Sequence, residues 1–260
     1  MKKIGLVLGG GGSRGLAHIG VLKELEKLNI NFSAIAGCSM GAIIGVLYAA
    51  GKTAQEIDDF ISSKRLVDFF DFSISRLGIN KTDKLQKLIE DFIGFKTFQK
   101  LKIPLYINAT NLSQGREVIF SKGNLFKAIR ASISVPGVFA PVQKDNSYYV
   151  DGGVLNQNPF SILPPEIDKY LIINASPYQG LGAYKKIDTM VLLDASLKLM
   201  QNEIMDLKLK TLSKDKKYVL IEPRLGNYSL IESSSKEREI INKGAKAIKD
   251  DLVEIKKIIR

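Results

Sequence analysis

The chain has 260 residues, 45% of them hydrophobic and 25% charged, which is the composition of an ordinary globular protein with a sizeable core. Its 38 Lys and Arg residues outnumber its 27 Asp and Glu residues, and the net charge of +11 would suit an anionic partner such as a membrane or a nucleic acid. No RNA- or DNA-binding module is recognisable, so a solvated lysine-rich surface is favoured over nucleic-acid binding. One cysteine, Cys38, and one histidine, His18, exclude an intrachain disulfide and a Cys/His metal site.

The first residues predict no secretory leader. In MKKIGLVL two lysines precede an apolar run, but the run ends after five residues in GGGGSRG and is too short for a signal peptide. No other stretch approaches the roughly 20 apolar residues that span a bilayer. We therefore expect a soluble, cytoplasmic protein, with peripheral contact to an anionic membrane as an open alternative.

Short apolar strands alternate with helices in the first part of the chain. We expect strands at 4–8 and 32–36, and helices at 16–28 and 42–50. Thr53 and Glu56 form a capping-box pattern that begins a further helix to about residue 62. This rhythm predicts an α/β fold with a mostly parallel central sheet flanked by helices in a three-layer architecture.

The later elements are less regular. Residues 64–100 show one helical stretch, at 83–93, and residues 134–142 predict an ordered loop because they hold two prolines and a glycine. Further strands are expected at 103–109, 117–120, 148–150, 171–174 and 218–221, and further helices at 125–132 and 187–210.

The end of the chain predicts one long helix. From Lys236 onward, apolar residues recur at spacings of four and three, which places them on one face with lysines opposite. We expect this face to dock onto the domain. A membrane-surface helix is the less favoured interpretation, because the face is aliphatic and has no aromatic anchor.

Residues 37–41 read GCSMG, a G-x-S-x-G pattern with Ser39 between Gly37 and Gly41. On a strand-to-helix turn this pattern exposes a serine hydroxyl as a nucleophile. The serine needs a base, which is usually a histidine. His18 lies on the inward stripe of the first predicted helix, four residues before Leu22, so a packing role is favoured over a catalytic one.

The glycine-rich segment GGGGSRG at 9–15 connects the first strand to the first helix, where backbone N–H groups can hold negative charge. A dinucleotide site is disfavoured because no acidic residue lies between Lys27 and Gln55, and a P-loop because no Lys-Ser or Lys-Thr follows the glycines. The remaining interpretation is an oxyanion hole. Both turns follow consecutive parallel strands, which predicts that they share one edge of the sheet.

Asp151 is the better candidate for the base. It follows a predicted strand and precedes Gly152 and Gly153, which let the backbone bend tightly around a site. The alternative is a turn aspartate that bonds its own backbone. A free Asp has a pKa near ~3.9, so it would need burial or a direct hydrogen bond to the serine to act as a base.

Taken in order, the segments 10–15, 37–41, 129–142 (IRASISVPGVFAPV) and 151–153 resemble the motifs of the patatin-like phospholipase family. The resemblance implies a single domain over residues 1–260, with the motifs in 3–165 and with 166–260 completing it. It also implies a catalytic dyad without histidine and no metal or organic cofactor. The residues that it assigns are Ser39 as nucleophile, Asp151 as base, Gly10, Gly11 and Gly12 as the oxyanion loop, and Ser13, Arg14 and Gly15 as its support.

We therefore predict a serine acyl hydrolase that cleaves lipid acyl esters as a phospholipase A or lysophospholipase, through an acyl-enzyme. A thioesterase or another carboxylesterase is one alternative. A non-catalytic, nucleotide-binding α/β regulatory module is the other. The sequence sets neither the lipid preference nor the oligomeric state.

Overall fold

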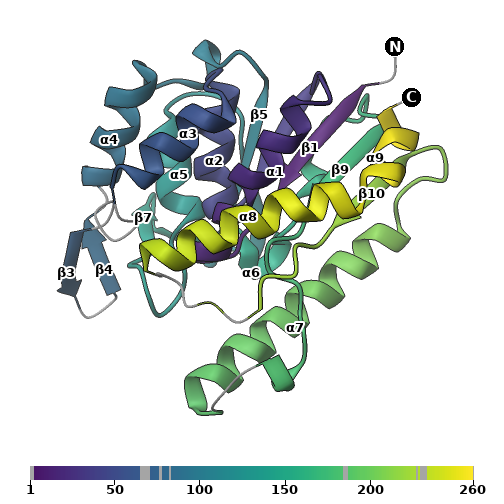
Figure 1. The fold of residues 1–260 in the computed structure, drawn as a ribbon. Coiled ribbons are helices and arrows are strands. Elements are labelled where there is room, and N and C mark those ends of the chain that lie inside the picture. Colours follow the sequence, from purple (N-terminus) through teal and green to yellow (C-terminus); the bar gives the residue numbers. More distant parts are fainter. Residues whose placement is uncertain are drawn as a thin grey trace.

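The computed structural model describes residues 3–64, 71–75, 78–81, 83–183, 187–226, 228 and 233–259. These residues form a central sheet with helices on both faces (Figure 1). The strands are β1 (Ile4–Leu8), β2 (Ala34–Gly37), β3 (Asp71–Ser75), β4 (Gly78–Lys81), β5 (Leu105–Asn111), β6 (Arg116–Phe120), β7 (Val142–Lys144), β8 (Ser147–Asp151), β9 (Lys169–Ile173) and β10 (Lys217–Ile221). The helices are α1 (Ala17–Glu26), α2 (Met40–Ala49), α3 (Ala54–Ser62), α4 (Asp83–Ile93), α5 (Leu125–Ser132), α6 (Gly153–Asn156), α7 (Thr189–Lys210), α8 (Ser234–Asp250) and α9 (Leu252–Ile259).

The central sheet has the strand order β10-β9-β1-β2-β5-β8-β7, with β6 also paired to β5. The strands from β10 to β5 run parallel, and β6, β8 and β7 are antiparallel additions. The mostly parallel α/β fold predicted from the sequence is thereby confirmed. In β1 and β2, Leu8 pairs with Gly37, so the loops that follow these two strands start side by side.

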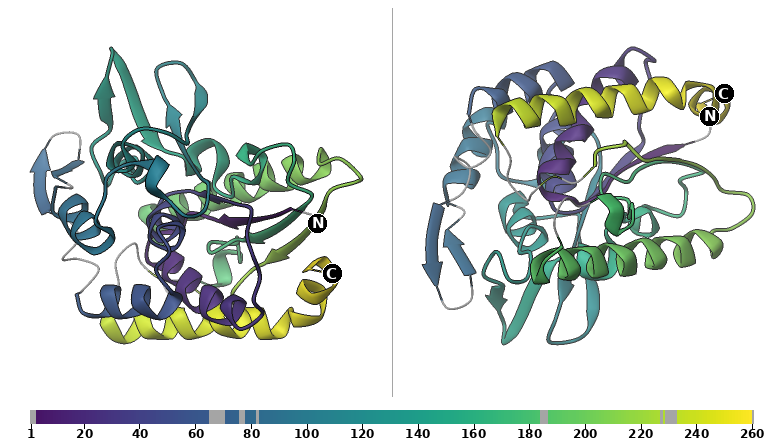
Figure 2. Two further views of the ribbon diagram at one scale, coloured as in Figure 1. Left: turned by 90° about the horizontal axis from the view of Figure 1, so that it is seen from above. Right: turned by 60° about the horizontal axis from the view of Figure 1, so that its bottom comes forward.

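Alternating side chains of the strands face two separate apolar layers. Leu6 and Leu8 of β1 belong to the larger core with α1, α2, α3 and α8, whereas Val7 faces a smaller core that includes Met205 of α7. Figure 2 shows α8 and α7 on opposite sides of the sheet. This arrangement is the predicted three-layer architecture, in which the sheet is buried on both faces.

The irregular stretch expected at 64–100 contains the β3–β4 hairpin, and α4 has the bounds predicted for its helix. Residues 65–70, 76–77 and 82 of this stretch lie outside the described residues.

The C-terminal helix docks on the domain, as the sequence predicts, but the prediction of one continuous helix is wrong. Asp251, with φ −97° and ψ 11°, separates α8 from α9. Asp favours helix ends because its side chain competes for backbone hydrogen bonds. Two glycines allow α8 to cross α1 at backbone contact, since a Cβ at Gly20 would lie 1.8 Å from Ile241 O and one at Gly244 would lie 2.0 Å from Ala17 O.

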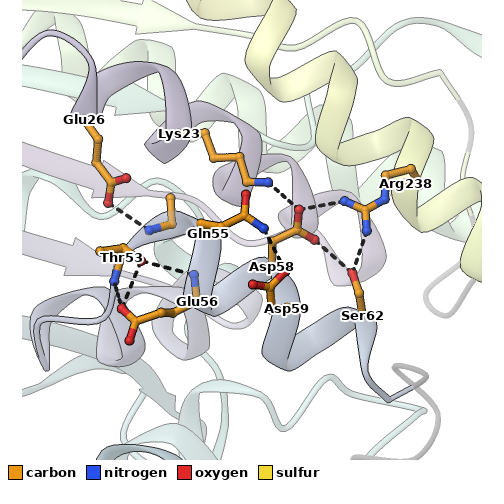
Figure 3. Close-up of polar contacts among 10 residues, drawn as sticks. Lys23, Glu26, Thr53, Gln55, Glu56, Asp58, Asp59, Ser62 and Arg238 are labelled. Atoms are coloured by element: carbon orange, nitrogen blue, oxygen red, sulfur yellow. Dashed lines mark hydrogen bonds and ion pairs between the residues drawn. The ribbon is translucent and has the colours of Figure 1, made fainter.

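A buried carboxylate ties α3 to both α1 and α8. Asp58 is 1% exposed and accepts hydrogen bonds from Lys23 (2.5 Å), Arg238 (2.6 Å) and Ser62 (2.9 Å), as Figure 3 shows. Burial raises the pKa of Asp58, but these three partners outweigh burial and hold the pKa below its ordinary value. The same figure shows the predicted capping box, in which Thr53 and Glu56 bond reciprocally at the start of α3.

Replacing Asp58→Asn should lower the free energy of unfolding by about 1 to 3 kcal/mol, because Lys23 and Arg238 lose their charged partner. Since the folded pKa is lowered, this stabilisation should be present above about pH 4 and vanish as the pH falls below it. Urea unfolding across this pH range measures the difference. Asp59→Asn, at an exposed neighbour whose side chain accepts a hydrogen bond from Gln55 (2.7 Å), is the matched control and should change stability by less than about 0.5 kcal/mol.

Candidate active site

Ser39 occupies the apex of a sharp turn between β2 and α2. Its backbone has φ 54° and ψ −123°, a left-handed conformation that is rare for a residue with a side chain. The turn is tight on both sides, since a Cβ at Gly37 would lie 2.7 Å from Gly41 O and one at Gly41 would lie 2.0 Å from Leu8 O. The G-x-S-x-G pattern therefore lies on a tight strand-to-helix turn, which is the backbone geometry of a nucleophile elbow.

The glycine loop after β1 packs directly against this elbow. A Cβ at Gly10 would meet Ser39 Cβ at 3.4 Å, and one at Gly15 would meet Met40 Cγ at 2.5 Å. Gly12 has φ 57° and begins the short 3-10 turn η1 (Gly12–Leu16). The absence of side chains brings the loop backbone to within contact distance of the serine.

The N–H groups of the loop are not equivalent. Gly10 N–H donates to Gln157 O at 3.0 Å, so this donor is already engaged. Within the described chain, neither Gly11 N–H nor Gly12 N–H has a hydrogen-bond acceptor. These two groups are the donors that the loop leaves free for an anion.

Asp151 lies at the end of β8, where it pairs with Ala109 of β5. Asp151 is only 6% exposed. Its Oδ1 accepts hydrogen bonds from the N–H of Gly153 at 2.7 Å and from the thiol of Cys38 at 3.6 Å. Oδ2 is buried and has no hydrogen-bond partner among the described residues. The carboxyl group is thus fixed through one oxygen and left unsatisfied at the other.

Burial raises the pKa of Asp151 to about 6, although contacts from Ser39, Gly153 and Cys38 act in the opposite direction. The Ser39 contact is a loose one, because the described structure has no Ser39–Asp151 hydrogen bond of ordinary length and angle. Catalytic hydrogen bonds often tighten only when substrate is bound. A carboxylate with a raised pKa is a stronger base than a free one, so burial makes Asp151 more basic than an ordinary aspartate.

Two neighbours of the elbow were not assigned a role from the sequence. Ser132, fully buried at the end of α5, accepts the Ser39 N–H with its Oγ at 2.8 Å. Gln157 holds the glycine loop from the other side, where its Nε2 donates to Gly10 O at 3.2 Å. Ser132 falls within the 129–142 motif, so the sequence contains a signal for it. No local sequence pattern indicates a role for Gln157.

Cys38 is a buried thiol rather than a second nucleophile. Burial, followed by the Asp151 carboxylate, raises the pKa of Cys38 well above its ordinary value. The thiolate is the reactive form of cysteine, so this thiol is unreactive and acts as a weak donor to Asp151.

His18 sits away from this pair in the hydrogen-bond network. Its Nε2 lies 2.8 Å from Gly9 O, which requires a proton on Nε2, and burial lowers the pKa of His18 to about 4. No hydrogen bond in the described residues joins it to Ser39 or Asp151. His18 is therefore a neutral side chain that fixes the end of β1 to α1.

The supporting residues link the loops to the rest of the molecule. Ser13 and Arg14 are buried, and Arg14 Nη2 donates to Tyr228 O at 2.6 Å and lies 3.9 Å from Asp194 of α7. At the other motif, a Cβ at Gly152 would lie 2.4 Å from Asn108 Oδ1 and one at Gly153 would lie 3.1 Å from Asp151 Oδ1. Gly152 therefore has no room for a side chain, and one at Gly153 would be tightly packed.

Among the described residues, no group of three or more His, Cys, Asp or Glu side chains could hold a metal ion. No described helix is long and apolar enough to cross a bilayer.

The family model for patatin-like phospholipases matches residues 6–164, which include the elbow, the glycine loop and Asp151. The chain belongs to the patatin-like phospholipase family. An NTE family protein of Mycobacterium bovis is 38% identical over 165 residues, which are 61% of this chain and 45% of that protein. The lysophospholipase NTE1 of Cryptococcus neoformans is 32% identical over 170 residues, 62% of this chain and 10% of that protein. The chain thus spans less than half the length of these curated relatives.

Solved structures support the fold beyond the matched region. The crystal structure of VipD from Legionella pneumophila aligns with 97% of this chain and 67% of its own, with a TM-score of 0.62 and 13% identity. The type III effector protein ExoU aligns with 98% of this chain and 53% of its own, with a TM-score of 0.56 and 14% identity. At this identity the similarity concerns the fold alone, and it extends over the C-terminal part that the family model does not match.

Covalent labelling of Ser39 by a fluorophosphonate should slow about tenfold per pH unit below pH about 6, because a protonated Asp151 cannot accept the serine proton. The raised pKa places this acid limb above that of an ordinary aspartate. The limb should persist in His18→Gln, because the pKa of His18 in the unmodified protein is lowered to about 4, well below the limb. A limb that disappears in His18→Gln would assign the base to the histidine instead.

Proposed function

We propose that the chain is a serine acyl hydrolase that cleaves acyl esters of lipids through a dyad of Ser39 and Asp151. The observation that carries this proposal is the meeting of three loops at one edge of the sheet: the elbow of Ser39, the free N–H groups of Gly11 and Gly12, and the buried carboxyl of Asp151. These are the parts that acyl transfer needs, namely a nucleophile, a base and a binding site for an oxyanion.

In the first half-reaction Ser39 Oγ attacks the ester carbonyl carbon while its proton passes to the Asp151 carboxylate. The negative charge that develops on the carbonyl oxygen is stabilised by Gly11 N–H and Gly12 N–H. Gly10 N–H serves the loop instead of the substrate, since Gln157 O holds it. Preorganised donors of this kind typically contribute on the order of 10² to 10³ in rate each.

The tetrahedral intermediate then collapses, the bond to the alcohol breaks, and Asp151 gives its proton to the leaving oxygen, which completes acylation. In the second half-reaction a water molecule attacks the acyl-enzyme and passes a proton to Asp151. The fatty acid departs as the proton returns to Ser39 Oγ. Asp151 alternates between base and acid, a role for which a pKa near neutrality is suited.

Lipid esters are the proposed substrates because the family is one of phospholipases and a fungal relative carries the name lysophospholipase. This favours a phospholipase A or lysophospholipase over a thioesterase. Comparing hydrolysis of diacyl phospholipid, lysophospholipid, triglyceride and acyl-CoA with one purified preparation would rank these classes directly.

Ser39→Ala should abolish both fluorophosphonate labelling and ester hydrolysis, because no other side chain stands at the apex of the elbow. Cys38→Ala should retain most of the hydrolysis, with a loss of no more than about tenfold, since it removes only a weak thiol donor to Asp151. Labelling followed by mass spectrometry locates the modified residue. Labelling that survives in Ser39→Ala and disappears in Cys38→Ala would refute the assignment.

Asp151→Asn and His18→Gln separate a dyad from a hidden histidine triad. Asp151→Asn keeps the shape of the side chain but removes the base, so kcat should fall by roughly 10² to 10⁴ or more. His18→Gln removes a buried ring that bonds Gly9 O, so it should cost about 1 to 3 kcal/mol of stability and leave kcat of the folded fraction near normal.

Measurements of kcat and thermal unfolding on both variants decide between the two mechanisms. A His18→Gln protein that unfolds cooperatively at the normal temperature yet has lost activity would overturn the dyad.

A further inference from the structure

In the first half of the long helix α7, charged and amide side chains lie toward the body of the protein and most large apolar side chains lie toward solvent, whereas Met205 in the second half is buried. Asp194, Lys198 and Gln201 follow the spacing i, i+4, i+7 and so share one side of the helix. Lys198, which is 7% exposed, pairs with Asp194, and Gln201 Nε2 donates to Gly153 O at 2.9 Å. The inner side is therefore a polar stripe that is anchored to the loop of Asp151.

The outer side of α7 is apolar. We call Leu192, Leu193, Leu197, Leu199 and Met200 the α7 apolar face; each is between 43% and 54% exposed. Leu193, Leu197 and Met200 again have the spacing i, i+4, i+7, and Leu192 and Leu199 are one heptad apart beside them. Leu181 and Ile187, just before the helix, are 38% and 53% exposed. A surface helix of a soluble protein ordinarily has the reverse orientation.

This apolar surface is a cluster rather than scattered exposure. Of the 13 large hydrophobic side chains that are exposed in the described structure, seven lie between residues 181 and 200. Contiguous apolar patches mark contact sites, whereas single exposed hydrophobics need no explanation. Figure 1 shows α7 at the margin of the molecule, and Figure 2 shows it on the side of the sheet opposite α8.

We propose that the α7 apolar face docks onto a lipid surface and holds the Ser39 site beside it. The same helix bonds Gly153, two residues after Asp151, so the face and the site are joined by one rigid element. Between residues 189 and 200 the charged side chains are Asp194 and Lys198, which pair with each other on the inner side. The face thus offers no charge to a protein partner, and hydrocarbon requires none.

The charge of the rest of the chain fits this occupant, because a net charge of +11 attracts anionic headgroups while the leucines enter the acyl region. No described helix can span a bilayer, so α7 would lie in the plane of the interface. The inference deepens the proposed function, on which it rests for the lipid substrate, and it names how the site would meet an insoluble ester.

The test uses the full chain and flotation with vesicles of phosphatidylcholine that contain a minority of phosphatidylglycerol. In the double variant Leu193→Gln with Met200→Gln, the vesicle partition coefficient should fall at least about tenfold, because two apolar side chains no longer enter hydrocarbon. Glutamine keeps helix propensity, and both positions are exposed, so the thermal unfolding temperature should not change. Val253→Gln, at a 66% exposed residue of α9, is the matched control and should bind as the unmodified chain does.

Two activity measurements separate this inference from the proposed function. The double variant should lose hydrolysis of vesicle phospholipid about as much as it loses binding, while kcat/KM on a water-soluble short-chain ester stays within about twofold. Ser39→Ala should bind vesicles normally while hydrolysing nothing, so vesicle binding is read out even if the hydrolase assignment fails. Unchanged vesicle binding of the double variant, or an equal loss in Val253→Gln, would overturn the proposal. The proposal would also be overturned if sedimentation showed the unmodified chain to be a dimer and the double variant to be a monomer, while vesicle binding stayed the same.

Discussion

The parallel pairing of β1 with β2 is the constraint on which the rest of the site depends. It ends with Leu8 opposite Gly37, so the glycine loop and the serine elbow leave the sheet at the same edge. The approach is close enough that a single carbon atom at Gly41 would collide with Leu8 O at 2.0 Å. A larger residue at that position would push α2 away from β1 and separate Ser39 from the glycine loop that packs against it.

In the proposed dyad, which has no histidine, burial has to raise the basicity of the aspartate. A free aspartate is too weak a base for a serine, and Asp151 gains basicity because desolvation disfavours its charged form. Too many donors would cancel the effect. Among the described residues, Oδ1 accepts the N–H of Gly153 and the weak thiol donor of Cys38, and Oδ2 has no hydrogen-bond partner. An ordinary hydroxyl or amide in place of the Cys38 thiol would hold the carboxylate more firmly and weaken it as a base.

Local patterns in the sequence were sufficient for most of the strands and helices, but not for the β3–β4 hairpin or the break between α8 and α9. The bounds of α4 and the capping box of Thr53 and Glu56 follow from periodicity and side-chain chemistry within a few residues. Residues 9–15 follow β1 and residues 37–41 begin at the last residue of β2, as local patterns also predict, while their catalytic roles stay predictions. What local patterns miss is long-range: Ser132 bonds Ser39 across 93 residues, and Gln157 bonds Gly10 across 147. Because Gln157 O accepts the Gly10 N–H, only Gly11 and Gly12 of the proposed oxyanion loop have free N–H groups in the described chain.

The orientation of α7 could not be predicted from its sequence, because leucines and methionines occur on most sides of this helix and periodicity gives no clear inner face. Polar contacts decide the matter. Asp194 pairs with Arg14 and Lys198, and Gln201 donates to Gly153 O. A rotation of α7 that buried its leucines would break these contacts and leave the polar groups unpaired. The terminal helix is the opposite case: its single apolar stripe docks on α1, as its pattern predicts. The spacing of apolar residues therefore predicts which face of a helix is buried only when the polar face of that helix makes no contacts with buried groups.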